Sequence, residues 1–538
     1  MKTFNFLLVL LIPIILLLSR RRRRGKKRRV VATTANRLCL PPSPWKLPLL
    51  GHLHHLVFSG GNLPHRSLRA LAAAHGPIML LHLGQVPTIV VSSAASAREV
   101  LQAQDHVFAS RPSLTVPRRL LYGCTDIAFA PHGPYWRAAR KMAVRHLLCP
   151  PMVRAHRAVR EQEVAALLRR VVGEQPSVRL SELLNGFAKD VAGRIVLGLR
   201  AAGDDGWRGK VDTLLEESNA LLAAFHVGDC VPWLSWVSAV DGTDGRVRRA
   251  FERIDRILDE ILDTAASTAS RGVVVEEEGT KDGEAFIHVL LSLQRKGDAA
   301  PETSSEWRLS IDNVKALLED LFGAGTEATI IVLEWAMAEL LRNKESMEKL
   351  QREVRQEAAR ARSATGSNHS NMVVGEEDLR GMEYLRAVIK ETMRLHPPGP
   401  LLLPHKSMRA TVIGGRHVVP SDTTVIVNAW AIGRDPEVWE ESPEEFRPER
   451  FVGSKVDFRG QHFQLIPFGA GRRMCPGVNL AMSVVELALA NLVARFDWAL
   501  PEGEAPLDME EMAGCTSRKK APLRAIAMEH CCSPGFCF

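Results

Sequence analysis

The sequence predicts a mainly α-helical fold with a small β region. Apolar residues recur at a spacing near 3.6 over several long segments, which is typical of amphipathic helices. The β-rich stretches are short and fall in two places, residues 78–92 and 411–427. The chain has 538 residues, 46% of them hydrophobic, which is ample for a large core. Length alone allows two to four compact units, but no clear linker follows residue 45. We therefore expect one body over residues 46–538.

The N-terminus is expected to form a single-pass transmembrane anchor over residues 1–19. Phe4 to Leu18 is apolar apart from Asn5. A short transmembrane span needs about 17 residues, and this segment reaches that length when its flanking residues are included. Nine basic residues lie between Arg20 and Arg29. Positive charge after the apolar run keeps the following chain in the cytosol. A signal peptide is the alternative, but its basic residues precede the apolar run.

Residues 20–45 are expected to form a basic and proline-rich linker. The nine basic residues of this segment account for the formal net charge of +9, so the remainder of the chain is balanced. A basic block beside an apolar stretch is typical of a membrane surface, and no groove-reading motif accompanies it, so we expect no nucleic-acid binding. Prolines 41, 42 and 44 make the end of the linker stiff.

The helical patterns follow one another along the body. Helices are expected around Trp136 and Arg140 and over residues 150–172, 310–341, 376–395 and 478–496. Residues 271–284 and 363–375 have the composition of loops. The nine cysteines include no Cys-x-x-Cys pair and suit no zinc site. Such scattered cysteines are typical of a reduced, cytosol-facing protein, in which most are small buried apolar residues.

The segment Phe468 to Gly477 carries the strongest chemical signal. It holds three glycines besides two arginines and Cys475, and a helical pattern follows it. Glycines let a backbone approach a flat ligand closely. A cysteine at a helix N-terminus is favoured as thiolate, and nearby N–H groups can bond to its sulfur. The alternative is a glycine-rich turn with a buried cysteine, which the order of these residues disfavours.

This segment resembles the haem-binding signature of the cytochrome P450 superfamily, Phe-x-x-Gly-x-Arg-x-Cys-x-Gly. The resemblance implies a cytochrome P450 fold and haem b as cofactor, with Cys475 as the axial thiolate of the iron. It also implies that Arg473 holds a haem propionate and that Phe468 and Gly477 belong to the cofactor site. Trp136 and Arg140 match the family's Trp-x-x-x-Arg pair, which reaches the propionates. His405 matches a further propionate partner.

Glu391 and Arg394 share a helix face because they are three residues apart. Taken alone they predict a weak surface ion pair. The resemblance implies instead a buried Glu-x-x-Arg pair, joined by Arg450 of the segment Pro448 to Phe451. The role of these three residues is structural, since a carboxylate shared by two guanidinium groups orders the backbone.

The expected helix at 310–341 contains two glycines, at 323 and 325, each of which costs about 1 kcal/mol against alanine. Such a cost indicates room for a ligand beside the backbone. The segment resembles the family's oxygen-binding motif, which implies catalytic roles for Glu327 and Thr329. It departs from the motif at Ala328, where the family has threonine. Thr329 cannot simply substitute, because one residue turns about 100° around a helix.

The whole body resembles the plant microsomal branch of the family. Its sequence is similar to those of the plant A-type group, which includes members from grasses. This implies an NADPH- and O2-dependent monooxygenase of the endoplasmic reticulum membrane. Its catalytic domain faces the cytosol and receives electrons from NADPH-cytochrome P450 reductase. Its substrate is a small hydrophobic metabolite, whether indole-derived, terpenoid or phenolic. Ala328 leaves open an isomerase, dehydratase or peroxide-using enzyme that needs no reductase. Candidate pocket segments are residues 113–125, 219–231, 322–324, 401–403 and 514–516.

Overall fold

Helices make up most of the molecule, so the expected fold class is confirmed. This computed structural model describes residues 38–58, 63–199, 205–222, 226–270, 283–298, 308–365, 374–501, 506–512 and 514–530. The expected anchor and most of the expected linker lie outside the described residues. So do most of the first expected loop, residues 366–373 of the second, and the cysteines at 531, 532 and 537.

The helices follow the expected order along the chain. Their bounds are α2 Leu53–Phe58, α3 Pro64–His75, α4 Ala94–Arg98, α5 Thr115–Leu120, α6 Pro134–Ala143, α7 Pro150–Ala155, α8 Arg157–Glu174, α9 Leu180–Ala192, α10 Asp205–Leu222, α11 Val227–Cys230, α12 Val237–Val240, α13 Thr243–Ser270, α14 Phe286–Asp298, α15 Ile311–Arg342, α16 Lys344–Thr365, α17 Glu383–Leu395, α18 Ala429–Ile432 and α19 Val478–Arg495.

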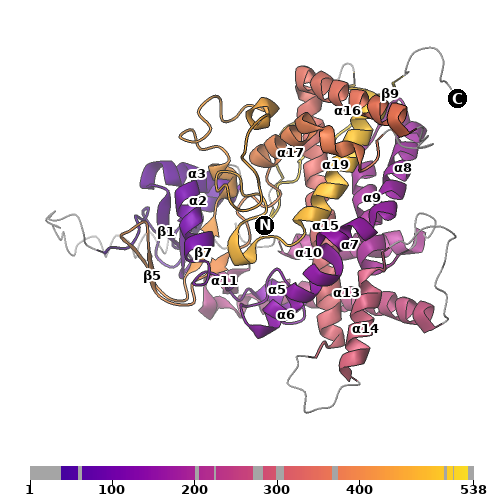
Figure 1. Cartoon of the computed structure of the whole chain (residues 1–538). Coiled ribbons are helices and arrows are strands. Elements are labelled where there is room, and N and C mark those ends of the chain that lie inside the picture. Colours follow the sequence, from indigo (N-terminus) through magenta and orange to yellow (C-terminus); the bar gives the residue numbers. More distant parts are fainter. Residues whose placement is uncertain are drawn as a thin grey trace, which may run out of the picture.

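The strands form three small sheets. A four-stranded sheet has the order β1 (Ile78–Leu83), β2 (Val86–Val91), β7 (Thr424–Val427) and β4 (His405–Lys406). Within it β2 and β7 run parallel, with Ile89 opposite Val425. Strands β3 (Ser177–Val178), β9 (Ala525–Glu529) and β8 (Phe496–Ala499) form a second sheet, and β5 (Thr411–Ile413) pairs with β6 (His417–Val419). Both expected β-rich stretches are therefore confirmed. Strands β1, β5 and β7 lie at the left of Figure 1, and β9 lies apart from them at the upper right.

Helix α15 runs through the middle of the helical body and packs against α9, α17 and α19 (Figure 1). Ser310 caps it: the serine hydroxyl accepts the backbone N–H of Asn313, and the Asn313 side chain accepts the Ser310 N–H in return. This reciprocal cap fixes where the helix begins. Most of its C-terminal half is buried, so the helix is held rigidly by its neighbours.

Helix α19 is also a core element. Its 18 residues have a mean hydropathy of 1.4, and this helix by itself is long and apolar enough to span a membrane. However, 67% of it is buried inside the protein. Its apolar surface is therefore used for packing against α8, α15 and α16.

Three expected boundaries are corrected by the structure. The expected helix at 150–172 is two helices, because the chain bends at His156 between α7 and α8. The helix expected from residue 376 begins at Glu383, after a 3₁₀ turn at Asp378–Gly381. Residues 363–365, expected in a loop, continue α16. In the first two cases the apolar pattern marks the buried face but not the point at which the helix begins or ends, and in the third the loop-like composition begins before the helix ends.

Candidate haem-thiolate site

The segment Phe468 to Gly477 forms a closed loop before α19. The Cys475 N–H donates to the Phe468 carbonyl at 2.9 Å. Gly471 has φ +66°, and a Cβ there would lie 1.7 Å from the Leu101 carbonyl oxygen. Only glycine fits at this position, since any side chain would collide with backbone. Gly477 is the N-terminal cap of α19, so the loop places Cys475 two residues before that cap.

The Cys475 thiol is accessible although protein surrounds it, so it lies on the wall of an internal space. Burial raises its pKa, while the Gly477 backbone N–H and the charge of Arg140 lower it. The helix N-terminus was expected to favour thiolate, but burial outweighs that effect here. A cation bound at the sulfur would restore the thiolate. The donor set therefore fits a thiolate ligand of an iron group.

The side of α15 at the centre of the helix is open. Ala324 and Gly325 are exposed, although Phe322 and Thr326 on either side are buried. A Cβ added at Gly325 would meet nothing within 4 Å. Exposed residues in the middle of a core helix indicate that α15 borders an internal space. The charge of Asp320, one helical turn before Ala324, contributes to raising the pKa of Cys475, so this part of α15 lies near the cysteine loop.

Glu327 is held by residues from two other segments. Its Oε2 accepts the Asn219 side-chain amide of α10 at 2.9 Å, and its Oε1 accepts the Thr516 hydroxyl at 2.9 Å. Arg518 donates to both oxygens, through Nε at 2.5 Å and through a second, very short bond. Thr329 points elsewhere: it is buried, and its hydroxyl donates to the Gly325 carbonyl at 2.7 Å.

Trp136 and Arg473 meet beside the loop that follows α5. The Arg473 guanidinium lies 4.1 Å from the centre of the Trp136 ring. Its three nitrogens donate to the carbonyls of Ala109, Ile127 and Ala130, and Trp136 Nε1 also donates to Ile127, at 3.1 Å. A guanidinium has five N–H groups, so these bonds leave two of them for another ligand.

Arg140 and His405 lie at two other edges of the site. Arg140 donates to the Met474 carbonyl at 2.6 Å, directly before Cys475. His405 Nδ1 is 2.8 Å from the Phe108 carbonyl. Burial and the nearby Arg111 charge lower the pKa of His405 to about 3, so this histidine is neutral at physiological pH. Of the expected propionate partners, Arg140 and Arg473 therefore carry the positive charge.

Asp320 of α15 holds the loop that Trp136 and Arg473 contact. Its Oδ2 accepts the N–H groups of Ile127 at 2.9 Å and Ala128 at 3.1 Å. Asp126, in the same loop, is fully buried, and burial together with the Asp320 charge raises its pKa. A carboxylate on α15 thus fixes the backbone whose carbonyls position the two side chains. No pattern in the sequence indicates this tie, because the partners are backbone groups about 190 residues away.

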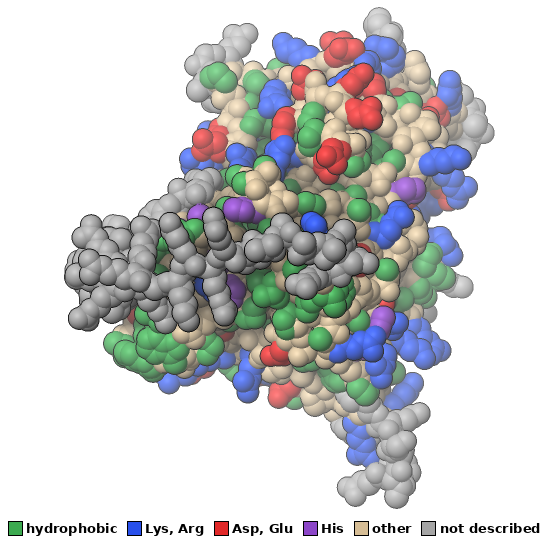
Figure 2. All heavy atoms as spheres, turned by 90° about the vertical axis from the view of Figure 1, so that its left-hand side faces the viewer, with side chains coloured by type: hydrophobic (Ala, Val, Ile, Leu, Met, Phe, Trp, Pro, Cys, Tyr) green, Lys and Arg blue, Asp and Glu red, His purple; other side chains and the backbone are tan. Residues whose placement is uncertain are grey.

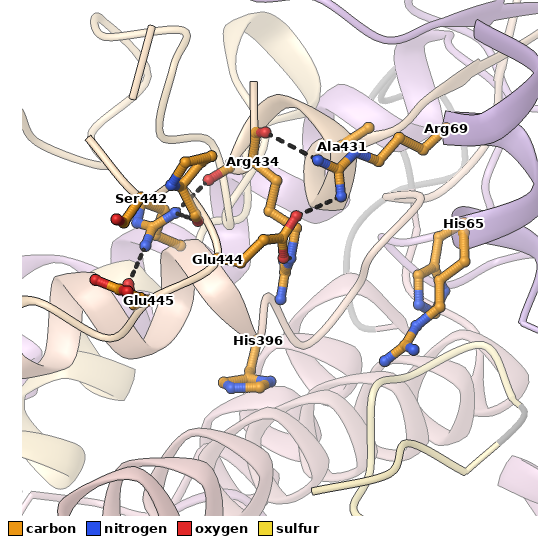
Figure 3. A network of polar contacts seen from close by, with 12 residues as sticks. His65, Arg69, His396, Ala431, Arg434, Ser442, Glu444 and Glu445 are labelled. Carbon is orange, nitrogen blue, oxygen red and sulfur yellow. Dashed lines mark hydrogen bonds and ion pairs between the residues drawn. The ribbon is translucent and has the colours of Figure 1, made fainter. Parts of the chain in front are cut away.

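Glu391, Arg394 and Arg450 come together as expected. Glu391 and Arg394 are fully buried, with bonds of 2.6 and 2.7 Å, and Arg450 Nε lies 3.4 Å from Glu391 Oε1. Arg394 also donates to the carbonyls of Gly433, Pro443 and Glu445. Figure 3 shows the adjoining network, in which Arg69 and Arg434 both reach Glu444. This cluster fixes the irregular segment before the cysteine loop.

Comparisons with known proteins agree with this geometry. The fold and an accessible cysteine before a core helix define a candidate haem-thiolate site. The model of the cytochrome P450 family matches residues 41–524. The chain belongs to the cytochrome P450 family, and it is a cytochrome P450 monooxygenase of the plant type, with cysteine-ligated haem as the cofactor of its family.

Two relatives and one solved structure illustrate the match. Cytochrome P450 736A117 of Prunus mume is 44% identical over 504 residues, which are 93% of this chain and 92% of that protein. Cytochrome P450 71A1 of Persea americana is 44% identical, covering 89% of this chain and 91% of that one. A zebra fish cytochrome P450 solved with progesterone has a TM-score of 0.69 at 25% identity, covering 86% of this chain and 99% of that one.

Proposed function

We propose that Cys475 would hold the haem iron through its thiolate in a monooxygenase acting on a small hydrophobic plant metabolite. The observation that carries this proposal is the accessible thiol before α19, in a region that the open side of α15 also faces. When bound, haem supplies the activation of dioxygen and the transfer of one oxygen atom to the substrate. The chain's own part is to bind and orient both ligands and to control protons and water.

The residues around the thiol suit the remaining parts of a haem. Arg473 keeps two N–H groups for a propionate, and Arg140 adds a second charge beside Met474. Trp136 stacks under Arg473 and fixes its plane. We assign Phe468 to packing against the cofactor and the Gly477 N–H to the sulfur, where it lowers the pKa of Cys475. His405 is a neutral hydrogen-bonding partner.

Glu327 is the acid that the site offers for proton movement, since α15 carries it two residues after Gly325. Thr329 was expected to share this role, but its hydroxyl bonds within its own helix. Its participation requires that bond to break. Ala328 supplies no hydroxyl, so a substrate hydroxyl, an ordered water or another side chain must complete a relay from Glu327.

The membrane and the reductase are the proposed partners. Figure 2 shows hydrophobic side chains gathered in the lower half of one face, with acidic side chains toward its top. Leu40, Trp45 and Trp233 are each more than half exposed. Both segments are tied to the β1–β2 hairpin, because the Leu80 N–H donates to the Pro42 carbonyl and the Gln85 N–H donates to the Cys230 carbonyl. We assign this surface to the endoplasmic reticulum membrane, with the catalytic domain on the cytosolic side.

Ala328 also favours a second candidate, a haem-thiolate isomerase, dehydratase or peroxide-using enzyme. The two candidates differ in their need for electrons. Microsomes holding the chain are incubated with candidate indole-derived, terpenoid and phenolic compounds, with and without NADPH and reductase. Product that carries one atom from labelled dioxygen and requires both additions supports the monooxygenase. Product formed equally without NADPH and reductase contradicts it and supports the second candidate.

A further inference from the structure

The missing hydroxyl at position 328 has a counterpart in another segment. We infer that Thr516, on the loop before β9, supplies to Glu327 the hydroxyl that Ala328 lacks. This inference rests on the proposed monooxygenase function and identifies a positioning residue for it. The Thr516 hydroxyl donates to Glu327 Oε1 at 2.9 Å, although 189 residues separate the two along the chain.

The neighbours of Glu327 fix the carboxylate and leave the hydroxyl available. Arg518 binds both carboxylate oxygens, and Asn219 occupies Oε2 on the side of α10. Glu327 is buried, with a tenth of its side chain exposed. A carboxylate held by a forked guanidinium keeps one orientation. The Thr516 hydroxyl donates to it and retains two lone pairs that can accept a further hydrogen bond.

The position of Thr516 is set by its neighbour Ser517. The Ser517 N–H donates to the Pro398 carbonyl at 3.0 Å, and its hydroxyl donates to the Pro397 carbonyl at 2.9 Å. Its own carbonyl accepts Trp335 Nε1 of α15 at 2.6 Å. Ser517 is 1% exposed. The loop is therefore tied to α15 one residue from Thr516, which holds the hydroxyl in register with Glu327.

Thr516 also borders the internal space. Cys515, the preceding residue, is accessible although protein surrounds it, as is Cys475. Its thiol donates to the Leu222 carbonyl at 3.3 Å, so the loop faces the end of α10. Thr516 itself is partly exposed. Water or a substrate oxygen in this space can therefore reach its hydroxyl.

This arrangement can move one proton without a net change on Thr516. When Glu327 carries a proton, it donates that proton to the Thr516 oxygen. The Thr516 hydroxyl then passes its own hydrogen to a water in the space, and Glu327 is left as carboxylate. At the Thr516 oxygen one O–H bond forms and one breaks, whereas Glu327 loses an O–H bond and the water gains one and becomes hydronium. A threonine at position 328 would do the same from the helix itself, whereas alanine cannot.

The test uses the full chain in microsomes with reductase and NADPH but no added substrate. The readouts are the rate of NADPH consumption, the share of its electrons recovered as hydrogen peroxide, the dependence of both on pH, and the thermal unfolding midpoint. Thr516→Ala is expected to slow proton-dependent turnover by about 100-fold, the low end for a positioned proton-transfer group, and to raise the peroxide share. Thr516→Ser restores both, because it keeps the hydroxyl. Thr213→Ala, which removes a hydroxyl bonded within α10, changes neither.

Two further variants separate a hydroxyl role from simple support of Glu327. Ala328→Thr is expected to rescue Thr516→Ala, because it returns a hydroxyl to the helix. Asn219→Ala removes one bond to Glu327 but no hydroxyl, and it is expected to act less strongly than Thr516→Ala. Equal losses in the two variants, or failed rescue with unchanged unfolding midpoints, would overturn the inference. Wild-type protein that forms haem-thiolate but consumes no NADPH would overturn the proposed function as well.

Discussion

Removal of the Glu391 carboxylate should destabilise the protein far more than removal of a comparable surface carboxylate. Glu391 is fully buried and accepts two bonds from Arg394. In Glu391→Ala the Arg394 guanidinium stays buried but loses this carboxylate, and it keeps its hydrogen bonds to backbone carbonyls. Glu449→Ala is the matched control. Glu449 lies on the segment that carries Arg450, and it pairs with Lys349 at 2.8 Å while 43% of its side chain is exposed.

The expected magnitudes follow from burial. Breaking a buried ion pair from one side costs about 3–5 kcal/mol, whereas an exposed pair contributes about 0–1 kcal/mol. The unfolding entropy is about 2 cal/mol/K per residue, or roughly 1 kcal/mol/K for this chain. Glu391→Ala should therefore lower the unfolding midpoint by about 3–5 °C, and Glu449→Ala by about 1 °C or less.

The assay is thermal unfolding of the detergent-solubilised proteins, followed by circular dichroism at one heating rate. Haem content is measured on the same samples, because the Glu391 cluster orders the chain before the cysteine loop. A larger loss of both stability and haem in Glu391→Ala is the expected result. Equal midpoints for the two variants would refute the reasoning, since burial would then make no difference to the pair.

Two other predictions concern a buried acid and a glycine. The His65 and Arg66 side chains lower the pKa of Glu511 to about 2. A carboxyl group whose pKa is lowered by folding stabilises the protein above its unfolded pKa, here near 4.5. This contribution is lost as the pH falls toward 2. Glu511→Gln should therefore cost about 3 kcal/mol of stability at pH 7. The difference in unfolding midpoint between the variant and the wild type should shrink between pH 4.5 and 2. A difference that does not change with pH would contradict this. Gly471→Ala should reduce haem retention, because the added Cβ would collide with the backbone. Gly453→Ala is the control and should retain haem, because Gly453 has a similar φ of +68° but open space around it. Equal haem retention in the two purified variants would show that the close backbone approach at Gly471 is not needed.

The sequence predicted the elements better than the contacts between them. Apolar periodicity is a local signal, so α15 and α17 were predicted with errors only at their ends. The Glu391 cluster was found because the motif carries its partners within sixty residues. In contrast, the ties of Glu327 to Arg518 and of Asp320 to the Ile127 backbone depend on tertiary packing.

In the candidate site, too, local features were predictable from the sequence and effects of tertiary packing were not. The residue types near Cys475 were predictable from the motif, whereas the electrostatic outcome was not. The helix N-terminus was expected to favour thiolate, yet burial raises the pKa of Cys475. Burial of a loop cysteine depends on segments far apart in the chain. Thr516 was inside an expected pocket segment, but nothing in the sequence connected its hydroxyl with Glu327.

The most direct test of the central claim is the carbon monoxide spectrum of the reduced protein in microsomes. Wild-type protein should show a strongly red-shifted Soret band, because thiolate ligates the iron. Cys475→Ala should lose this band, and Cys149→Ala, which alters a thiol beside the Arg145 carbonyl, should keep it. A red-shifted band that survives in Cys475→Ala, or folded wild-type protein without haem, would contradict the assignment of Cys475 as the thiolate ligand.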